Sequence, residues 1–123
     1  MKNKKVLLVE DDQFIIDIYT TKLKQAGFEV EAVEDGGEVL KKLKETKPDI
    51  LLLDIVLPGM NGWEVLEAIR NLNEFKDLPV IVLSNLYQKE EVERAARFKI
   101  IKYMIKAHHT PSEVVEEVKK ALA

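Results

Sequence analysis

Polar side chains that could do chemistry follow four of the apolar runs in this sequence. They are three acids after the first run, one acid at the end of the third, a hydroxyl at the end of the fourth and an ammonium after the fifth: Glu10, Asp11, Asp12, Asp54, Ser84 and Lys106. Asp54 raises a question of its own, because it closes an apolar run that is typical of a buried strand. A buried carboxylate without a partner is costly, so we expect Asp54 to have partners or a chemical role.

An acidic cluster beside a lysine and a hydroxyl predicts phosphoryl-transfer chemistry. Several carboxylates stay ionised together only when a cation is near. Oxygen ligands without histidine or cysteine favour Mg²⁺ or Ca²⁺, and a site with few carboxylates leaves positions for water and phosphate, which favours Mg²⁺. Lys106 and Ser84 suit phosphoryl oxygens. Asp54 is then a candidate nucleophile that attacks a phosphoryl donor.

Alternating strand and helix patterns indicate the element order that would position these groups. Expected strands are Val6–Val9, Phe28–Val33, Ile50–Asp54, Pro79–Ser84 and Lys102–Ile105, and expected helices are roughly 13–26, 37–46, 61–72, 88–98 and 111–122. This alternation is typical of an α/β protein with a parallel sheet. In such a sheet the carboxyl ends of all strands lie at one edge, where ligands bind. We therefore expect the polar groups to meet there.

The strands differ in their expected burial. Three runs are apolar throughout and suit strands that are covered on both faces. Phe28–Val33 alternates apolar residues with Glu29 and Glu31, and the short run Lys102–Ile105 lies between lysines. These two runs are therefore expected at the edges of the sheet.

Composition limits the possible classes of protein. The chain has 123 residues, of which 46% are hydrophobic, and a net charge of -3. These values predict one domain over residues 1–123, with no direct nucleic-acid binding. The chain contains no cysteine, which excludes disulfides and thiolate sites and fits a cytoplasmic location. No apolar run approaches the length of a membrane span or a signal peptide.

Each polar residue also has a purely structural interpretation when it is taken alone. Asp12 is the best candidate for the cap of the first helix, where acids are favoured, and Asn61 and Thr110 are predicted caps further along. Asp54 could cap a turn, and Ser84 and Lys106 could be ordinary surface groups. The conjunction of complementary groups at four strand ends favours a functional site. We expect the adjacent His108 and His109 to be ordinary loop residues.

Four segments together resemble the receiver domain of two-component response regulators, the family of the chemotaxis response regulator. They are Val6–Asp12, Leu53–Asp54 followed by Leu57–Gly62, Val82–Ser84 and Tyr103–Lys106. The resemblance covers essentially the whole chain. It implies a doubly wound (βα)5 flavodoxin-like fold with a five-stranded parallel sheet of order 2-1-3-4-5. It also implies a signalling domain, rather than a conventional enzyme, that assists its own phosphorylation and dephosphorylation.

The resemblance implies a role for each matching residue. Asp54 accepts a phosphoryl group from a phosphohistidine on a sensor histidine kinase or a histidine phosphotransfer protein, and Lys106 contacts the phosphoryl oxygens with Ser84. Mg²⁺ is held by Asp11 directly, by Glu10 through water, by Asp54 and by the carbonyl of Val56. Tyr103 is the aromatic switch residue that turns inward when Ser84 moves. The output face is the fourth helix, fifth strand and fifth helix, and the chain is a monomer or a weak phosphorylation-linked dimer.

The sequence departs from the family pattern at three places. Ala107 replaces the usual proline after the lysine, Lys99-Ile100 replaces the usual Gly-Ala before the fifth strand, and Asn85 stands where a small residue is common. Val56 and Leu86, which flank the site, are both apolar and cannot orient a hydrolytic water. We therefore expect a long-lived phosphoryl group.

Two other functions stay open at this point. The departures are compatible with a pseudo-receiver, a protein-interaction module that does not depend on phosphorylation. A Mg²⁺-dependent phosphatase with an aspartyl intermediate would need a second acid two residues after Asp54, where the chain has Val56. Output would pass to a downstream protein or to an output domain absent from this chain, and the sequence does not name the kinase or the target.

Overall fold

Five parallel strands form one sheet in the computed structural model, which describes residues 3–123. Met1 and Lys2, which the predicted domain includes, lie outside the described residues. The strands are β1 (Lys5–Val9), β2 (Glu29–Val33), β3 (Ile50–Leu53), β4 (Val80–Ser84) and β5 (Lys102–Ile105). Their order is β2-β1-β3-β4-β5, which confirms the predicted fold class and topology.

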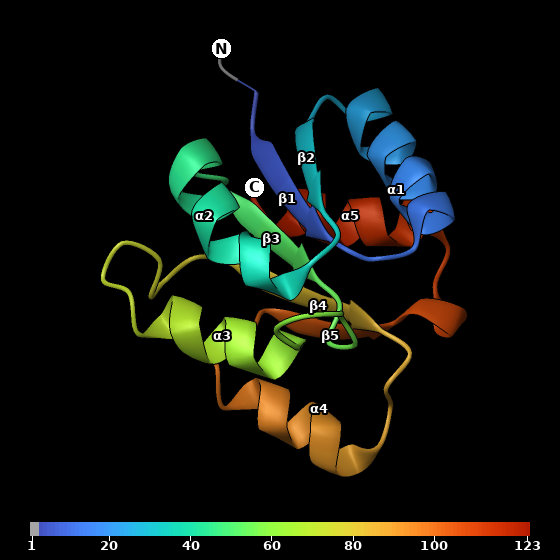
Figure 1. Cartoon of the computed structure of the whole chain (residues 1–123). Helices are drawn as coiled ribbons and strands as arrows, with labels where there is room; N and C mark the ends of the chain where they lie inside the picture. Colours follow the sequence, from blue (N-terminus) through green and yellow to red (C-terminus); the bar gives the residue numbers. More distant parts are fainter. Residues whose placement is uncertain (1–2) are drawn as a thin grey trace.

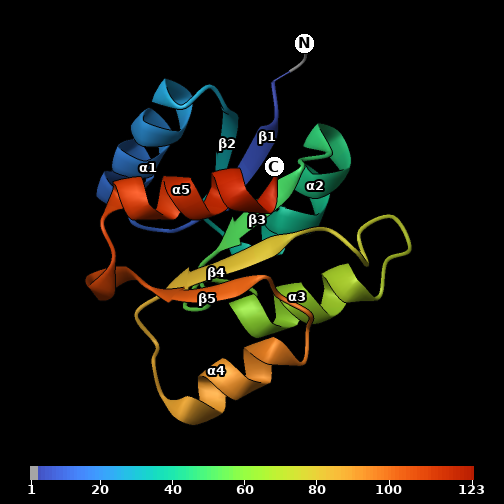
Figure 2. The same cartoon turned by 180° about the vertical axis from the view of Figure 1, so that it is seen from behind.

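Helices cover both faces of this sheet (Figures 1 and 2). Helices α1 and α5 lie on one face, and α2, α3 and α4 lie on the other. Their bounds are α1 (Gln13–Gln25), α2 (Val39–Thr46), α3 (Gly62–Arg70), α4 (Lys89–Ala96) and α5 (Pro111–Ala121), with short 3-10 turns at Gly36–Glu38 and Lys106–His108. Within residues 3–123, none of the helices combines the length and apolar character that a membrane crossing requires.

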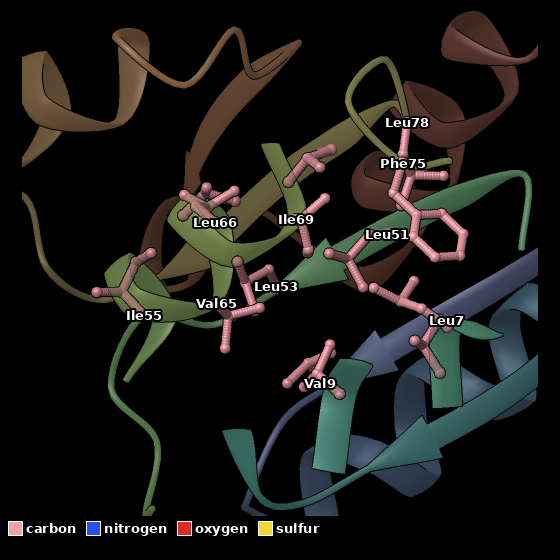
Figure 3. Close-up of a cluster of buried hydrophobic side chains, with 14 of the residues drawn as sticks. Leu7, Val9, Leu51, Leu53, Ile55, Val65, Leu66, Ile69, Phe75 and Leu78 are labelled. Atoms are coloured by element: carbon pink, nitrogen blue, oxygen red, sulfur yellow. The ribbon is translucent and has the colours of Figure 1, made fainter. Parts of the chain in front are cut away.

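Alternating residues of the central strands supply two apolar layers. Leu7, Leu51 and Val80 face α2 and α3, whereas their neighbours Leu8 and Leu52 face α1 and α5. Figure 3 shows the first layer, where side chains of β1 and β3 meet those of α3. Burying each large apolar side chain contributes roughly 1.5–3 kcal/mol. The central strands are therefore a rigid base for the groups that follow them.

Edge strand β2 is less buried, as its alternating sequence predicts. Glu29 and Glu31 are exposed, while Val33 is buried. The other edge strand, β5, buries only Met104 fully. Both outer strands were therefore predicted correctly.

Caps begin the helices where the sequence indicates. Oδ1 of Asp12 accepts the N–H groups of Phe14 and Ile15 at 2.9 and 3.3 Å. Asn61 and Thr110 each form a reciprocal capping box with the glutamate three residues later. A side-chain cap satisfies N–H groups that have no partner inside the helix, so these residues fix where the chain turns away from the sheet edge.

Arg70, the last residue of α3, ties α3 to the turn that precedes β5. Its guanidinium donates to the carbonyls of Phe98 at 2.7 Å and Leu78 at 2.8 Å, with longer bonds to Lys99 and to the loop before β4. Lys99 adopts a left-handed conformation with φ of 58°, which is strained for a residue with a side chain. Arg70 therefore holds the turn where the sequence lacks the family's usual glycine.

Candidate functional site

The carboxyl ends of four adjacent strands bring the predicted polar groups to one edge of the sheet. Glu10 directly follows β1, Asp54 follows β3, Ser84 ends β4 and Lys106 follows β5. These strands are consecutive neighbours in the sheet. Side chains from residues 10 to 106 of the sequence therefore meet in one place because of the strand order.

Lys106 bridges the two buried acids of this cluster. Its ammonium donates to Oδ2 of Asp54 at 2.7 Å and also to Oε1 of Glu10. Glu10 and Asp54 are 2% and 6% exposed, so both acids are largely withdrawn from water. A buried carboxylate needs an ionic or hydrogen-bonding partner, and Lys106 supplies it to both.

Burial and neighbouring charges have opposite effects on the pKa values of Glu10 and Lys106. Burial raises the pKa of Glu10, while Lys106 and the backbone N–H of Asp12 oppose that rise. Burial alone would lower the pKa of Lys106, but the hydrogen bonds to Asp54 and Glu10 outweigh it and raise that pKa. Lys106 therefore keeps its proton and its positive charge beside the acids.

Asp54 is held at both of its oxygens. Oδ2 accepts from Lys106, and Oδ1 accepts the backbone N–H of Val56 at 3.1 Å. The side chain of Val56 itself is 58% exposed. The carboxylate is thus fixed in orientation at the edge of the sheet, in a loop that opens toward solvent.

Three acids form a group that could hold a metal ion. Ligand oxygens of Glu10, Asp11 and Asp54 all lie within 4.8 Å of one another, and Asp11 is exposed. Oε2 of Glu10 accepts the N–H groups of Asp11 and Asp12, each at 3.1 Å, which orients the Glu10 carboxylate. Hard oxygen ligands with an open side fit the preferences of Mg²⁺. Asp12 caps α1 and is not a member of this group.

Ser84 and Tyr103 contact the same residue of the loop that follows β4. Oγ of Ser84 accepts the N–H of Leu86 at 3.3 Å, and the hydroxyl of Tyr103 donates to the carbonyl of Leu86 at 2.6 Å. Ser84 is fully buried, and burial is the main cause that raises the pKa of Tyr103. The two predicted switch residues are therefore connected through one peptide segment.

Sequence reasoning missed two interactions, one at the site and one at the opposite edge of the sheet, where β4 and β5 begin. Asn85 accepts the backbone N–H of Ala107 through Oδ1 at 3.0 Å, and Arg70 binds the carbonyls of the turn before β5. Asn85 and Ala107 were each identified as departures from the family pattern. Their contact was not predicted, because it depends on how two separate loops bend.

A carboxylate next to an ammonium and a possible cation site can act as a nucleophile toward a phosphoryl group. Positive charge near the attacking oxygen and the incoming phosphate lowers the repulsion between them. Lys106 provides one fixed positive charge. Ser84 offers a hydroxyl on the neighbouring strand end.

The known proteins that this chain resembles include response regulators. Residues 6–119 match the family described as "Response regulator receiver domain". The phosphate regulon transcriptional regulatory protein PhoB of Rhizobium meliloti (strain 1021) is 33% identical over 118 residues, which cover 96% of this chain and 52% of PhoB. The chain spans about half the length of the curated relatives it matches.

Solved structures of similar length agree in fold. The CheY-like receiver domain protein of Methanospirillum hungatei JF-1 superposes with a TM-score of 0.90 at 29% identity, covering 98% of this chain and 94% of that one. The phosphorylated cyanobacterial phytochrome response regulator RcpA gives a TM-score of 0.84 at 30% identity, with coverage of 97% and 91%.

Proposed function

The chain belongs to the response regulator receiver domain family, and from this membership we propose that it is a phosphoacceptor switch of a two-component or phosphorelay system. Asp54 is the acceptor, and a phosphohistidine of a sensor histidine kinase or a histidine phosphotransfer protein is the donor. The observation that carries the proposal is the ion pair of Lys106 with buried Asp54. RcpA, a similar protein, was solved in a phosphorylated form.

The transfer forms one bond and breaks another. A carboxylate oxygen of Asp54 bonds to phosphorus while the P–N bond of the donor breaks, and the imidazole leaves with the electron pair and takes a proton from water. Lys106 then donates to a phosphoryl oxygen in addition to its present partners, and Ser84 donates to a second one. Mg²⁺ bound by Glu10, Asp11, Asp54 and the carbonyl of Val56 would supply further positive charge for the phosphoryl oxygens.

Switching follows from a change of partner at Ser84. In the present arrangement the Ser84 hydroxyl accepts from the N–H of Leu86. When Ser84 turns to the phosphoryl group, Leu86 loses this contact and the Tyr103 bond to its carbonyl moves with the loop. A ligand shifts a conformational equilibrium only by its differential affinity for the two states, and near-complete switching needs roughly 5 kcal/mol. The altered face is α4, β5 and α5.

Intact mass after incubation with Mg²⁺ and acetyl phosphate tests the proposal directly. We expect one added phosphoryl group in the parent, and none in Asp54→Ala or without Mg²⁺. Asp12→Asn is the matched control, because it removes a neighbouring acid that caps α1 and keeps a capping side chain. This control should be modified like the parent.

Absence of the added mass in the parent would contradict the proposal. Binding of beryllofluoride, which mimics a phosphoryl group, then separates a closed site from a poor donor. A protein that takes neither group would be a pseudo-receiver, for which Ala107, Lys99 and Asn85 are the relevant departures. Turnover of an added phosphate ester would instead indicate a phosphatase, although Val56 stands where that class needs its second acid.

Output is proposed to pass through protein contacts of the switched face. PhoB is named a transcriptional regulatory protein and is about twice the length matched here. The partner of this chain is accordingly either a separate protein or an output domain that these residues do not include. The cytoplasmic location, the single domain over residues 1–123 and the monomer or weak dimer stay predictions.

A further inference from the structure

A hydrogen bond joins the two loops that carry Ser84 and Lys106. Oδ1 of Asn85 accepts the backbone N–H of Ala107 at 3.0 Å. Asn85 immediately follows Ser84, and Ala107 immediately follows Lys106. The bond therefore links the two residues that follow Ser84 and Lys106, the side chains that the proposed function places on the phosphoryl group.

The backbone that carries Lys106 has few other restraints. Strand β5 is at the edge of the sheet, and Lys106 begins the 3-10 turn Lys106–His108, which has no buried residue and no side-chain cap. The hydrogen bond that closes this turn, from the N–H of His109 to the carbonyl of Lys106, is long at 3.4 Å. Within residues 3–123, side-chain hydrogen bonds to this turn consist of the Asn85 bond and those of the Lys106 ammonium.

We propose that Asn85 is a positioning residue for phosphoryl transfer: its bond to Ala107 fixes the backbone after Lys106 and so aims the ammonium at Asp54. The inference rests on the proposed function of Asp54 and Lys106. A lysine side chain is long and flexible, so the position of its ammonium group depends on where its backbone is held. Small displacements of a group that orients the reaction can slow it greatly.

The backbone N–H of Ala107 also explains why this position carries a residue other than proline. A proline at position 107 would have no N–H to donate, and the Asn85 amide would then lack this partner. In this chain a donor at 107 and an acceptor at 85 occur together, and both residues are exposed. Two departures from the family pattern are thus explained by one contact.

A different role for Asn85 predicts the opposite result. If the side chain only narrowed access to Asp54, shortening it would speed phosphorylation. If it positions Lys106, loss of its acceptor oxygen slows phosphorylation whatever the size of the replacement. Asn85→Ala removes both bulk and acceptor, and Asn85→Leu keeps the bulk and removes the acceptor.

Time courses of intact mass with acetyl phosphate and Mg²⁺ provide the test. We expect Asn85→Ala and Asn85→Leu to be modified about five- to tenfold more slowly than the parent, the range that one modest hydrogen bond supports. Asn85→Asp keeps an acceptor oxygen and should stay within about twofold of the parent. Hydrogen exchange at the Ala107 amide should become faster in the Ala and Leu variants.

A double-variant comparison separates positioning from a general effect on the fold. Because Asn85 acts through Lys106, Asn85→Ala should have no further effect on the rate in a Lys106→Ala background, whereas a purely structural role would slow both backgrounds equally. An Asn85→Leu variant as fast as the parent, or equal slowing in both backgrounds, would overturn the inference alone. A parent that is never modified at Asp54 would overturn the proposed function and the inference with it.

Discussion

Two neighbouring units of the molecule, β3 with α3 and β4 with α4, have similar strand ends at the site but differ in how their helices are buried and capped. At the site, Asp54 directly follows β3 and Ser84 ends β4. Each strand leads through a loop into a helix, of nine residues in α3 and eight in α4. Helix α3 buries five of its residues, but α4 buries only Ala95. Asn61 caps α3 through its side chain, whereas Gln88 makes no such bond at α4.

The end of α4 is nevertheless fixed to α3. The ring of Phe98 stacks on Trp63 at a centroid distance of 6.4 Å, and the guanidinium of Arg94 lies 4.8 Å above the same indole. Arg70 binds the carbonyl of Phe98. The comparison indicates that α3 is anchored along its length by buried residues, whereas α4 is anchored mainly at its C-terminal end.

Equal truncations in the two helices give the largest expected difference. Val65 of α3 is fully buried and Val92 of α4 is only partly buried. Val65→Ala should lower the free energy of unfolding by about 2.5 kcal/mol, because it removes two methyl groups and leaves a cavity. Val92→Ala should cost less than about 1 kcal/mol. Urea unfolding measures both, and equal losses would contradict the distinction.

Removing Arg70 should free the anchored end of α4. Arg70→Met leaves several partly buried carbonyls without their donor, and we expect a loss of about 2 kcal/mol in unfolding free energy. Amide exchange should rise in the turn around Phe98 and Lys99. Arg70→Lys is the control, and it should recover only part of the loss because an ammonium lacks the planar fork of donors. Full recovery by lysine would show that charge alone holds the turn.

Polar residues at the matching positions of the two loops should shorten the lifetime of the proposed phosphoryl group on Asp54. Val56 lies two residues after Asp54, and Leu86 lies two residues after Ser84. Val56→Asn should speed decay about tenfold, equivalent to about 1.4 kcal/mol of barrier, since an amide can orient a water. Leu86→Gln should have a smaller effect, because position 86 is partly buried and packs against the core. Decay of the added mass measures both, and unchanged rates would count against the expected long lifetime.

The smallest expected contrast is at the helix caps. Asn61→Ala should cost about 1 kcal/mol, because it breaks the capping box of α3. Gln88→Ala should change stability by less than about 0.5 kcal/mol, since Gln88 makes no side-chain cap bond at α4. Thermal unfolding of the pair checks this, and a larger effect at Gln88 would reverse the order.

Local patterns predicted most elements but placed several ends too far along the chain. The helices expected to end at 72 and 98 end at Arg70 and Ala96. Leu72 and Phe98 are apolar and pack on the core, but they do so from the turns that follow the two helices. Periodicity reports which residues are buried, and it does not tell whether a buried residue at an end is helical.

The grouping of Asp54, Glu10 and Lys106 was predictable because parallel strands end at one edge. The roles of Asn85 and Arg70 were not. Both bind backbone atoms of distant loops. The residue types of a loop do not indicate which of its carbonyl or N–H groups a distant side chain will bind. Predicting such contacts requires knowledge of the conformations of both segments, which only the structure provides.

Lys106 and Glu10 form an ion pair although they lie 96 positions apart in the sequence. This separation has a consequence while the chain is being synthesised. The acids are made first, and the lysine that pairs with them follows the last strand, β5. Because domains generally fold as units, a nascent chain that lacks β5 cannot assemble the complete charged group. The grouping of Glu10, Asp54 and Lys106 therefore cannot be complete before translation has passed the last strand.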